Sequence, residues 1–178
     1  LDTIDLKSLR SKIGVVMQNG KLFQGDIYSN IVISAPWLTM DSAWEAAEMA
    51  GIADDIRRMP MGMHTLISEG SGGISGGQRQ RLMIARAIAP KPRILMFDEA
   101  TSALDNLTQK TVSDSLGRLK CTRIVIAHRL STIRRCDRIL VLDQGKIIED
   151  GTYEELLAAG GSFAELVARQ RLDGAQAG

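Results

Sequence analysis

The stretch Gly70–Ile88 reads GSGGISGGQRQRLMIARAI. Five of its first eight residues are glycine, and a helix-forming pattern follows at once. The spacing predicts a helix over Gln78–Ala89, with Ser75, Gly76 and Gly77 at its N-cap and first turn. The first N–H groups of a helix have no internal acceptor, and the helix dipole favours negative charge there. The stretch therefore predicts a phosphate-binding helix end, where glycines leave the backbone accessible and the Ser75 hydroxyl adds a donor.

A flexible Gly/Ser linker followed by a capped helix is the alternative interpretation of this stretch. A linker, however, does not require the sequence Ser-Gly-Gly-Gln set directly on a helix start. Ligand binding at Ser75–Gln78 is therefore the favoured hypothesis.

A buried strand that ends in two carboxylates follows this helix. Ile94–Phe97 are all apolar, as is typical of a parallel strand buried on both faces, and Asp98 and Glu99 come next. Open α/β sheets bind ligands outside the carboxyl ends of such strands. We expect Asp98 to hold Mg²⁺, through water, and Glu99 to orient or deprotonate a water that attacks a γ-phosphate. Two carboxylates that cap the next helix are the alternative, which the preceding phosphate-type helix disfavours.

The order of the remaining elements predicts an α/β fold with a parallel sheet. Residues 33–90 are expected to be mostly helical, whereas strands dominate after Pro92. We expect the following elements: a strand over Ile13–Met17; a helix capped by Asp41 and stopped at Gly51; a turn or two of helix over Ile52–Arg58; a helix capped by Asp105; a strand over Arg123–Ala127; a short helix from Ser131; a hairpin of Arg138–Leu142 and Lys146–Glu149; and two final helices with capping boxes Thr152/Glu155 and Ser162/Glu165.

The composition gives no reason to expect a polyanionic partner. The chain has 22 basic and 21 acidic residues, for a formal net charge of +1, so nucleic acid is not the default ligand. Cys121 and Cys136 are too few for a disulfide framework and lack metal-ligand spacing, so we expect structural thiols. No apolar run approaches the roughly 18 residues that cross a bilayer.

Five motifs occur in a specific order along the chain. Gln18, ISGGQ at Ile74–Gln78, ILMFDE at Ile94–Glu99, SALD at Ser102–Asp105 and His128 resemble the Q-loop, signature, Walker B, D-loop and H-loop of an ABC transporter ATPase domain. The resemblance covers essentially the whole chain. It implies a P-loop NTPase-like ABC ATPase fold with a parallel core sheet and a helical subdomain. The implied segments are 1–32, core with the Q-loop; 33–90, helical subdomain with the signature; 91–150, core with Walker B, D-loop and H-loop; and 151–178, C-terminal helices.

The resemblance also implies a shared ATP and Mg²⁺ site. In this family the signature of one subunit closes over ATP held by a second ABC ATPase domain, in a head-to-tail dimer. The implied roles are as follows: Ser75, Gly76, Gly77 and Gln78 contact the nucleotide; Asp98 serves the metal; Glu99 is the general base; Gln18 joins the Mg²⁺ or attacking water to the membrane-facing side; Asp105 links the two sites; and His128 holds the γ-phosphate. A lone histidine hydrogen-bonded at a strand end is the alternative for His128.

The Walker A loop of the family, G-x-x-x-x-G-K-[ST], is missing from the chain. The closest stretch, GVVMQNGKL, has five residues between Gly14 and Gly20, and Leu22 stands where a hydroxyl should bind Mg²⁺. We therefore expect the Walker A loop to belong to sequence that precedes Leu1. The chain by itself is expected neither to bind ATP tightly nor to hydrolyse it, whereas the parent protein should do both.

Two stretches resemble ABC exporters in particular. They are MQNGKLFQGDIYSNI at Met17–Ile31 and SEGSGG at Ser68–Gly73. The second stretch departs from the commoner exporter pattern. Together with MPMGMHT at Met59–Thr65 and ATSALDN at Ala100–Asn106, it is more similar to bacterial peptide or bacteriocin-type exporters. The resemblance implies a transmembrane domain as partner, a place at the cytoplasmic face of the bacterial inner membrane, and a peptide as cargo.

Two other classes of protein stay open. A soluble ABC-type ATPase of DNA repair or chromosome organisation would carry a long coiled coil between Gln18 and Ser75, where no heptads occur. The basic residues Arg129, Arg134, Arg135 and Arg138 would suit nucleic acid, but an exposed helix face explains them as well. A non-catalytic interaction module is the third possibility.

Overall fold

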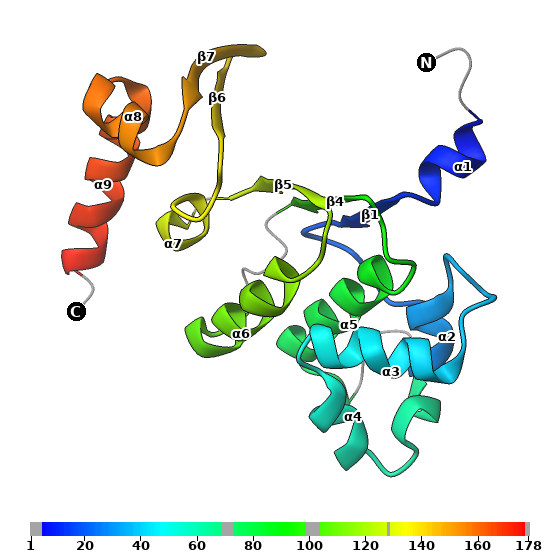
Figure 1. Ribbon diagram of the computed structural model, residues 1–178. Helices are drawn as coiled ribbons and strands as arrows, with labels where there is room; N and C mark the ends of the chain where they lie inside the picture. Colours follow the sequence, from blue (N-terminus) through cyan, green and yellow to red (C-terminus); the bar gives the residue numbers. More distant parts are fainter. Residues whose placement is uncertain (1–4, 69–72, 99–103, 128, 177–178) are drawn as a thin grey trace. The chain divides into compact units, whose positions relative to one another are not determined.

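The computed structural model describes residues 5–68, 73–98, 104–127 and 129–176 (Figure 1). The chain divides into two compact units, Leu1–Ile126 and Ala127–Gly178, and each is described by itself. The functional segments expected from the sequence remain a prediction. Within the described residues, no helix is both long enough and apolar enough to cross a membrane.

The first unit is built on a parallel sheet, which confirms the predicted α/β class. Strands β1 (Ile13–Val16), β4 (Ile94–Asp98) and β5 (Thr122–Ile126) lie in the order β1-β4-β5. The register places Val16 beside Phe97, and Asp98 beside Ile126. The carboxyl ends of all three strands therefore meet at one edge, where the predicted site residues Gln18 and Asp98 belong.

Helix α5 (Gly76–Ile88) packs against β1 of this sheet, and its two contacts with the segment Gly14–Gly20 show that it runs in the opposite direction. Near its end, Ala87 lies so close to β1 that a Cβ on Gly14 would clash with the Ala87 carbonyl oxygen. One turn earlier on α5, the Met83 sulfur would lie 2.6 Å from a Cβ on Gly20, a residue that follows the end of β1. The helix between Met83 and Gly76 spans about 10 Å at 1.5 Å per residue. The first turn of α5 consequently extends beyond the carboxyl edge of the sheet.

Helices α2 (Ile27–Val32) and α3 (Met40–Met49) pack against α5 in the same unit. The unit also contains α1 (Leu6–Arg10), α4 (Ala53–Arg58) and the 3-10 helix η1 (Gly62–His64), with a small antiparallel pair of β2 (Gly25–Asp26) and β3 (Leu66–Ile67). Helix α4 confirms the predicted turns over Ile52–Arg58. Gly51 ends α3 as expected, because its φ of +67° suits glycine.

The predicted N-cap of α3 was wrong by two residues. Thr39 caps the helix by accepting a hydrogen bond from the Ser42 N–H at 3.3 Å, and Asp41 lies in the first turn. The earlier start includes Met40, which packs against the core, and still leaves the Asp41 carboxylate near the positive end of the helix dipole.

Helix α6 (Asn106–Gly117) confirms another predicted cap. The Asp105 carboxylate accepts from the Thr108 N–H at 2.9 Å. Val112 and Leu116, which lie four residues apart on one face of this helix, are both buried.

The second unit consists of a hairpin and helices. Its elements are α7 (Leu130–Ile133), β6 (Ile139–Asp143), β7 (Lys146–Gly151), α8 (Tyr153–Ala159) and α9 (Ser162–Gln176). The predicted hairpin and the capping box of Thr152 and Glu155 are confirmed.

The start of α9 differs from the predicted capping box. Ser162 lies inside the helix, and the carboxylate of Glu149, on β7, accepts from the Phe163 N–H at 2.8 Å. A side chain from β7 thus takes over the capping that the local spacing assigned to Ser162.

Candidate functional site

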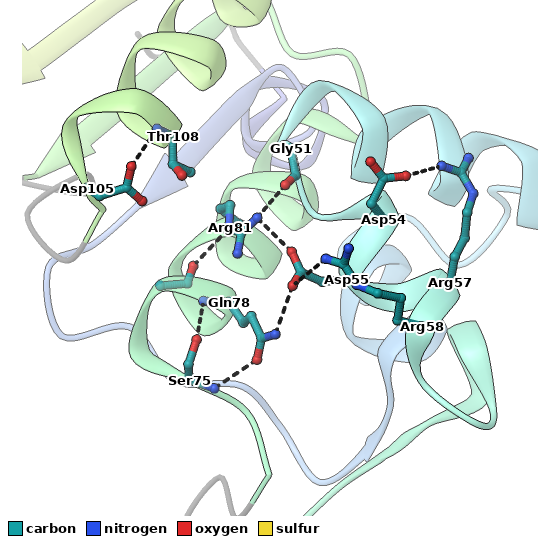
Figure 2. A network of polar contacts seen from close by, with 11 residues as sticks. Gly51, Asp54, Asp55, Arg57, Arg58, Ser75, Gln78, Arg81, Asp105 and Thr108 are labelled. Atoms are coloured by element: carbon teal, nitrogen blue, oxygen red, sulfur yellow. Dashed lines mark hydrogen bonds and ion pairs between the residues drawn. The ribbon is translucent and has the colours of Figure 1, made fainter.

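The first turn of α5 forms the capping box that its sequence predicts (Figure 2). Ser75 Oγ accepts from the Gln78 N–H at 3.1 Å, and Gln78 Oε1 accepts from the Ser75 N–H at 3.0 Å. Ser75 and Gly76 are exposed, and a Cβ built on Gly76 would meet nothing within 4 Å. The start of this helix is therefore open to a ligand.

This helix end suits an anion. The Ser75 oxygen accepts from Gln78 and keeps its own hydroxyl proton for donation. The N–H groups of Gly76 and Gly77 belong to the first turn, where the helix dipole favours negative charge, and that turn carries no acidic side chain. The residues present therefore fit a phosphate group.

Gln78 does not have a free side chain in this arrangement. Its Oε1 is bonded to the Ser75 N–H, and its Nε2 donates to Asp55 Oδ1 at 3.1 Å. The amide that the family resemblance assigned to nucleotide contact thus holds the helix end together.

Asp55 stands at the centre of the polar network behind this helix end (Figure 2). It accepts from Gln78 and pairs with Arg81, whose Nη1 lies 2.9 Å from Asp55 Oδ2. Arg58 lies 3.4 Å from the other carboxylate oxygen. Burial by itself would raise the pKa of Asp55, but the hydrogen bond from Gln78 and the positive charge of Arg81 outweigh it, so the pKa lies below its ordinary value. Asp55 is therefore an ionised carboxylate at neutral pH.

Gln18 and Asp98 lie at the carboxyl edge of the sheet. Gln18 follows β1 and is exposed, whereas Asp98 ends β4 and is half-buried. Among the described residues, no three His, Cys, Asp or Glu side chains gather as a metal cluster. One carboxylate nevertheless suits Mg²⁺, which commonly uses one or two carboxylates together with waters and substrate phosphates.

Three predicted site residues need separate comment. Asp105 caps α6, so it has a structural role whatever else it contacts. Glu99 and His128 lie outside the described residues, and their roles remain predictions.

Sequence reasoning missed a second network, at the other end of α5. Arg86 donates from Nε to the Asn30 carbonyl at 2.9 Å, from Nη2 to Asn30 Oδ1 at 2.7 Å, and from Nη1 to the Lys21 carbonyl at 3.0 Å. Its guanidinium also lies over the Phe23 ring, 5.0 Å from the centroid. Burial lowers the pKa of Arg86, although arginine keeps its charge at neutral pH.

Asn30 completes this second network. It is 2% exposed, and its side chain bonds to both Phe23 N–H and Phe23 carbonyl, at 2.8 and 2.9 Å, and to the Asp26 carbonyl at 3.0 Å. A polar residue within the buried face of an apolar helix was the signal available in the sequence. The network ties the segment that follows Gln18 to α5.

Comparison with known proteins identifies the class. The ABC transporter family model matches residues 1–102, more than half of the chain, and the chain belongs to that family. Among similar proteins, "Alpha-hemolysin translocation ATP-binding protein HlyB" of Escherichia coli O157:H7 is 46% identical over 160 residues, covering 89% of this chain and 23% of that protein. "Transport/processing ATP-binding protein ComA" of Streptococcus pneumoniae is 45% identical over 168 residues, covering 94% and 23%.

A solved structure shows which type of ABC transporter this chain resembles. The structure of a bacterial Atm1-family ABC exporter with ATP bound has a TM-score of 0.88 and 43% identity, and it covers 92% of this chain and 29% of that one. The chain is thus an exporter-type ABC ATP-binding domain. It spans less than a third of the length of each of these relatives.

Proposed function

We propose that this chain supplies the signature half of an ATP site whose other half lies on a second ABC ATPase domain. The first turn of α5 carries this proposal, because it extends past the carboxyl edge of its own sheet and leaves Gly76 open. A phosphate there would face outward, where another chain can present it. Closure of two such domains around ATP would drive transport across a membrane.

The residues take distinct parts in this function. Ser75, Gly76 and Gly77 bind the γ-phosphate through the hydroxyl and first-turn N–H groups. Asp98 would hold Mg²⁺, which when bound would neutralise charge on the phosphates, and Glu99 would orient the attacking water. Gln18 joins this site to the membrane side, Asp105 links the two sites across the dimer, and His128 contacts the γ-phosphate.

We further propose a second kind of partner, a transmembrane domain, which this chain meets at the cytoplasmic face of a bacterial inner membrane. The proposed cargo is a peptide. The printed names of the two relatives, one for alpha-hemolysin translocation and one for transport and processing, support this choice. The nearly balanced charge, +1 overall, supports a partner other than nucleic acid.

The test measures ATP turnover by the full-length protein that carries these residues together with a Walker A loop. Glu99→Gln should lower the rate by at least about 100-fold, the usual range for losing a general base. Glu45→Gln is the matched control, because Glu45 lies on α3 in an exposed ion pair with Lys91. Unchanged turnover in Glu99→Gln would favour the non-catalytic module instead.

The 178-residue chain is tested separately by calorimetry with MgATP. Without a Walker A lysine and loop, it should show no tight binding. Micromolar affinity would contradict this half-site assignment.

A further inference from the structure

We propose that Asp55 is a positioning residue for the signature end, holding Ser75 and Gly77 in the geometry that meets a phosphate. Asp55 acts through Gln78 and Arg81 and does not itself contact the ligand. This inference rests on the proposed function, because it assigns a role within the same ATP site.

The first connection runs from Asp55 through the Gln78 amide to Ser75. An amide has one accepting oxygen and one donating NH₂ group, so fixing one end fixes the other. The Asp55 carboxylate only accepts, and it therefore holds Nε2 of Gln78 towards itself, at 3.1 Å. Oε1 is then left to accept from the Ser75 N–H, at 3.0 Å. If the amide turned over, its NH₂ group would face the Ser75 N–H, and the capping box would lose half of its bonds.

The second connection runs through Arg81, on the next turn of α5. Arg81 pairs with Asp55 at 2.9 Å, and it also donates to the Gly51 carbonyl and, at 3.4 Å, to the Gly77 carbonyl. The side chains of Arg81 and Asp55 are 15% and 20% exposed, so water screens this ion pair poorly. Asp55 thus joins α4 to the first turn of α5 by two routes.

The neighbouring carboxylate offers a matched comparison. Asp54 lies on the same turn of α4 but points to Arg57 and has an 81% exposed side chain (Figure 2). Losing its charge removes an exposed ion pair of small energetic value and leaves the α4–α5 junction unchanged. Asp54→Asn is therefore the control, because it removes one negative charge from the same turn of α4 without changing the contacts to Gln78 and Arg81.

The placement of Asp55 predicts which step it affects. A carboxylate repels phosphate, and Asp55 faces Gln78 and Arg81, so its removal should not disturb the Walker A half of the site. The expected effect is on closure of the signature over ATP held by the partner. Affinity of the open domain for ATP should stay nearly constant, while turnover falls.

The experiment measures ATP turnover and nucleotide affinity in the full-length protein. Asp55→Asn should lower kcat at least about tenfold and change the dissociation constant for MgATP by less than about twofold. Gln78→Glu should act similarly, because a carboxylate at this position can still cap Ser75 but cannot donate to Asp55. Asp54→Asn should match the wild type.

The double variant Asp55→Asn/Gln78→Glu distinguishes positioning from general destabilisation. It reverses donor and acceptor across the same pair without changing net charge. It carries the same first-turn carboxylate as Gln78→Glu but restores the bond between positions 55 and 78, so its turnover should exceed that of Gln78→Glu. A thermal melt of each variant identifies any that fails to fold. If Asp55→Asn fails to fold, Gln78→Glu takes its place as the single variant.

Each outcome supports or refutes the proposal. Turnover in Asp55→Asn equal to that in Asp54→Asn would overturn it, and so would a double variant that turns over no faster than Gln78→Glu. An inactive wild-type protein would overturn the proposed function and this inference with it, whereas an active wild type with unaffected variants would overturn this inference alone.

Discussion

Replacing Asn30 by alanine should destabilise the first unit by about 3 kcal/mol. The side chain makes three bonds to backbone groups, of Phe23 and Asp26, and one to the Arg86 guanidinium. At about 1 kcal/mol for each neutral bond and about 2 kcal/mol for the charged one, the upper bound is about 5 kcal/mol. Phe23 is 54% exposed, so its freed backbone groups regain water, and Arg86 keeps two carbonyl acceptors, which lowers the expected loss to about 3 kcal/mol.

A thermal melt followed by circular dichroism measures this loss. For a chain of this size, about 3 kcal/mol corresponds to a decrease in Tm of about 6–12 °C. Asn19→Ala is the matched control, because Asn19 is exposed and its removal should leave Tm nearly unchanged. A shift below about 2 °C in Asn30→Ala would refute the argument that this buried amide holds the segment after Gln18 to α5.

Three further predictions concern separate parts of the chain. Gly14→Ala should cost about 1–3 kcal/mol by urea unfolding, because its Cβ would clash with the Ala87 carbonyl, whereas Gly117→Ala, which meets open space in α6, should not destabilise. Gln144→Asn should slow amide exchange across β6 and β7 about twofold, because φ at Gln144 is +46° in a two-residue turn that favours Asn-Gly; unchanged exchange would contradict this. The folded-state pKa of Asp55 is lowered, so its stabilisation is complete above the unfolded value of about 4 and is lost as pH falls through the folded value. Asp55→Asn should therefore flatten stability against pH in that acid range, and an unchanged slope would count against the ionised pair.

Local patterns predicted the parts of the fold that depend on neighbouring residues. The caps at Ser75 and Asp105 and the stop at Gly51 each follow from backbone geometry within a few positions. The buried strand before Asp98 follows from an unbroken apolar run. These features place the signature helix and the sheet edge, and hence most of the described half of the site.

Three interactions that the sequence did not predict join residues far apart in the chain. Asn30 meets Arg86, Asp55 meets Gln78, and Glu149 caps α9 at Phe163. A polar residue has many acceptable partners, so only the packed fold decides which one it finds. Thr39 and Asp41 show the same limit at short range, because both are good N-caps and the core contact of Met40 selects the earlier one.

Both networks act on α5, although they lie at opposite ends of it. Near the first turn, Asp55 fixes the Gln78 amide that caps Ser75. Near the last turn, Arg86 holds the backbone of Lys21, which follows Gln18 by three residues. A helix with unbroken backbone bonds moves as one body, so a shift of either end displaces the other. If the first turn of α5 closes on a phosphate as we propose, the segment after Gln18 would therefore move with it through this single helix.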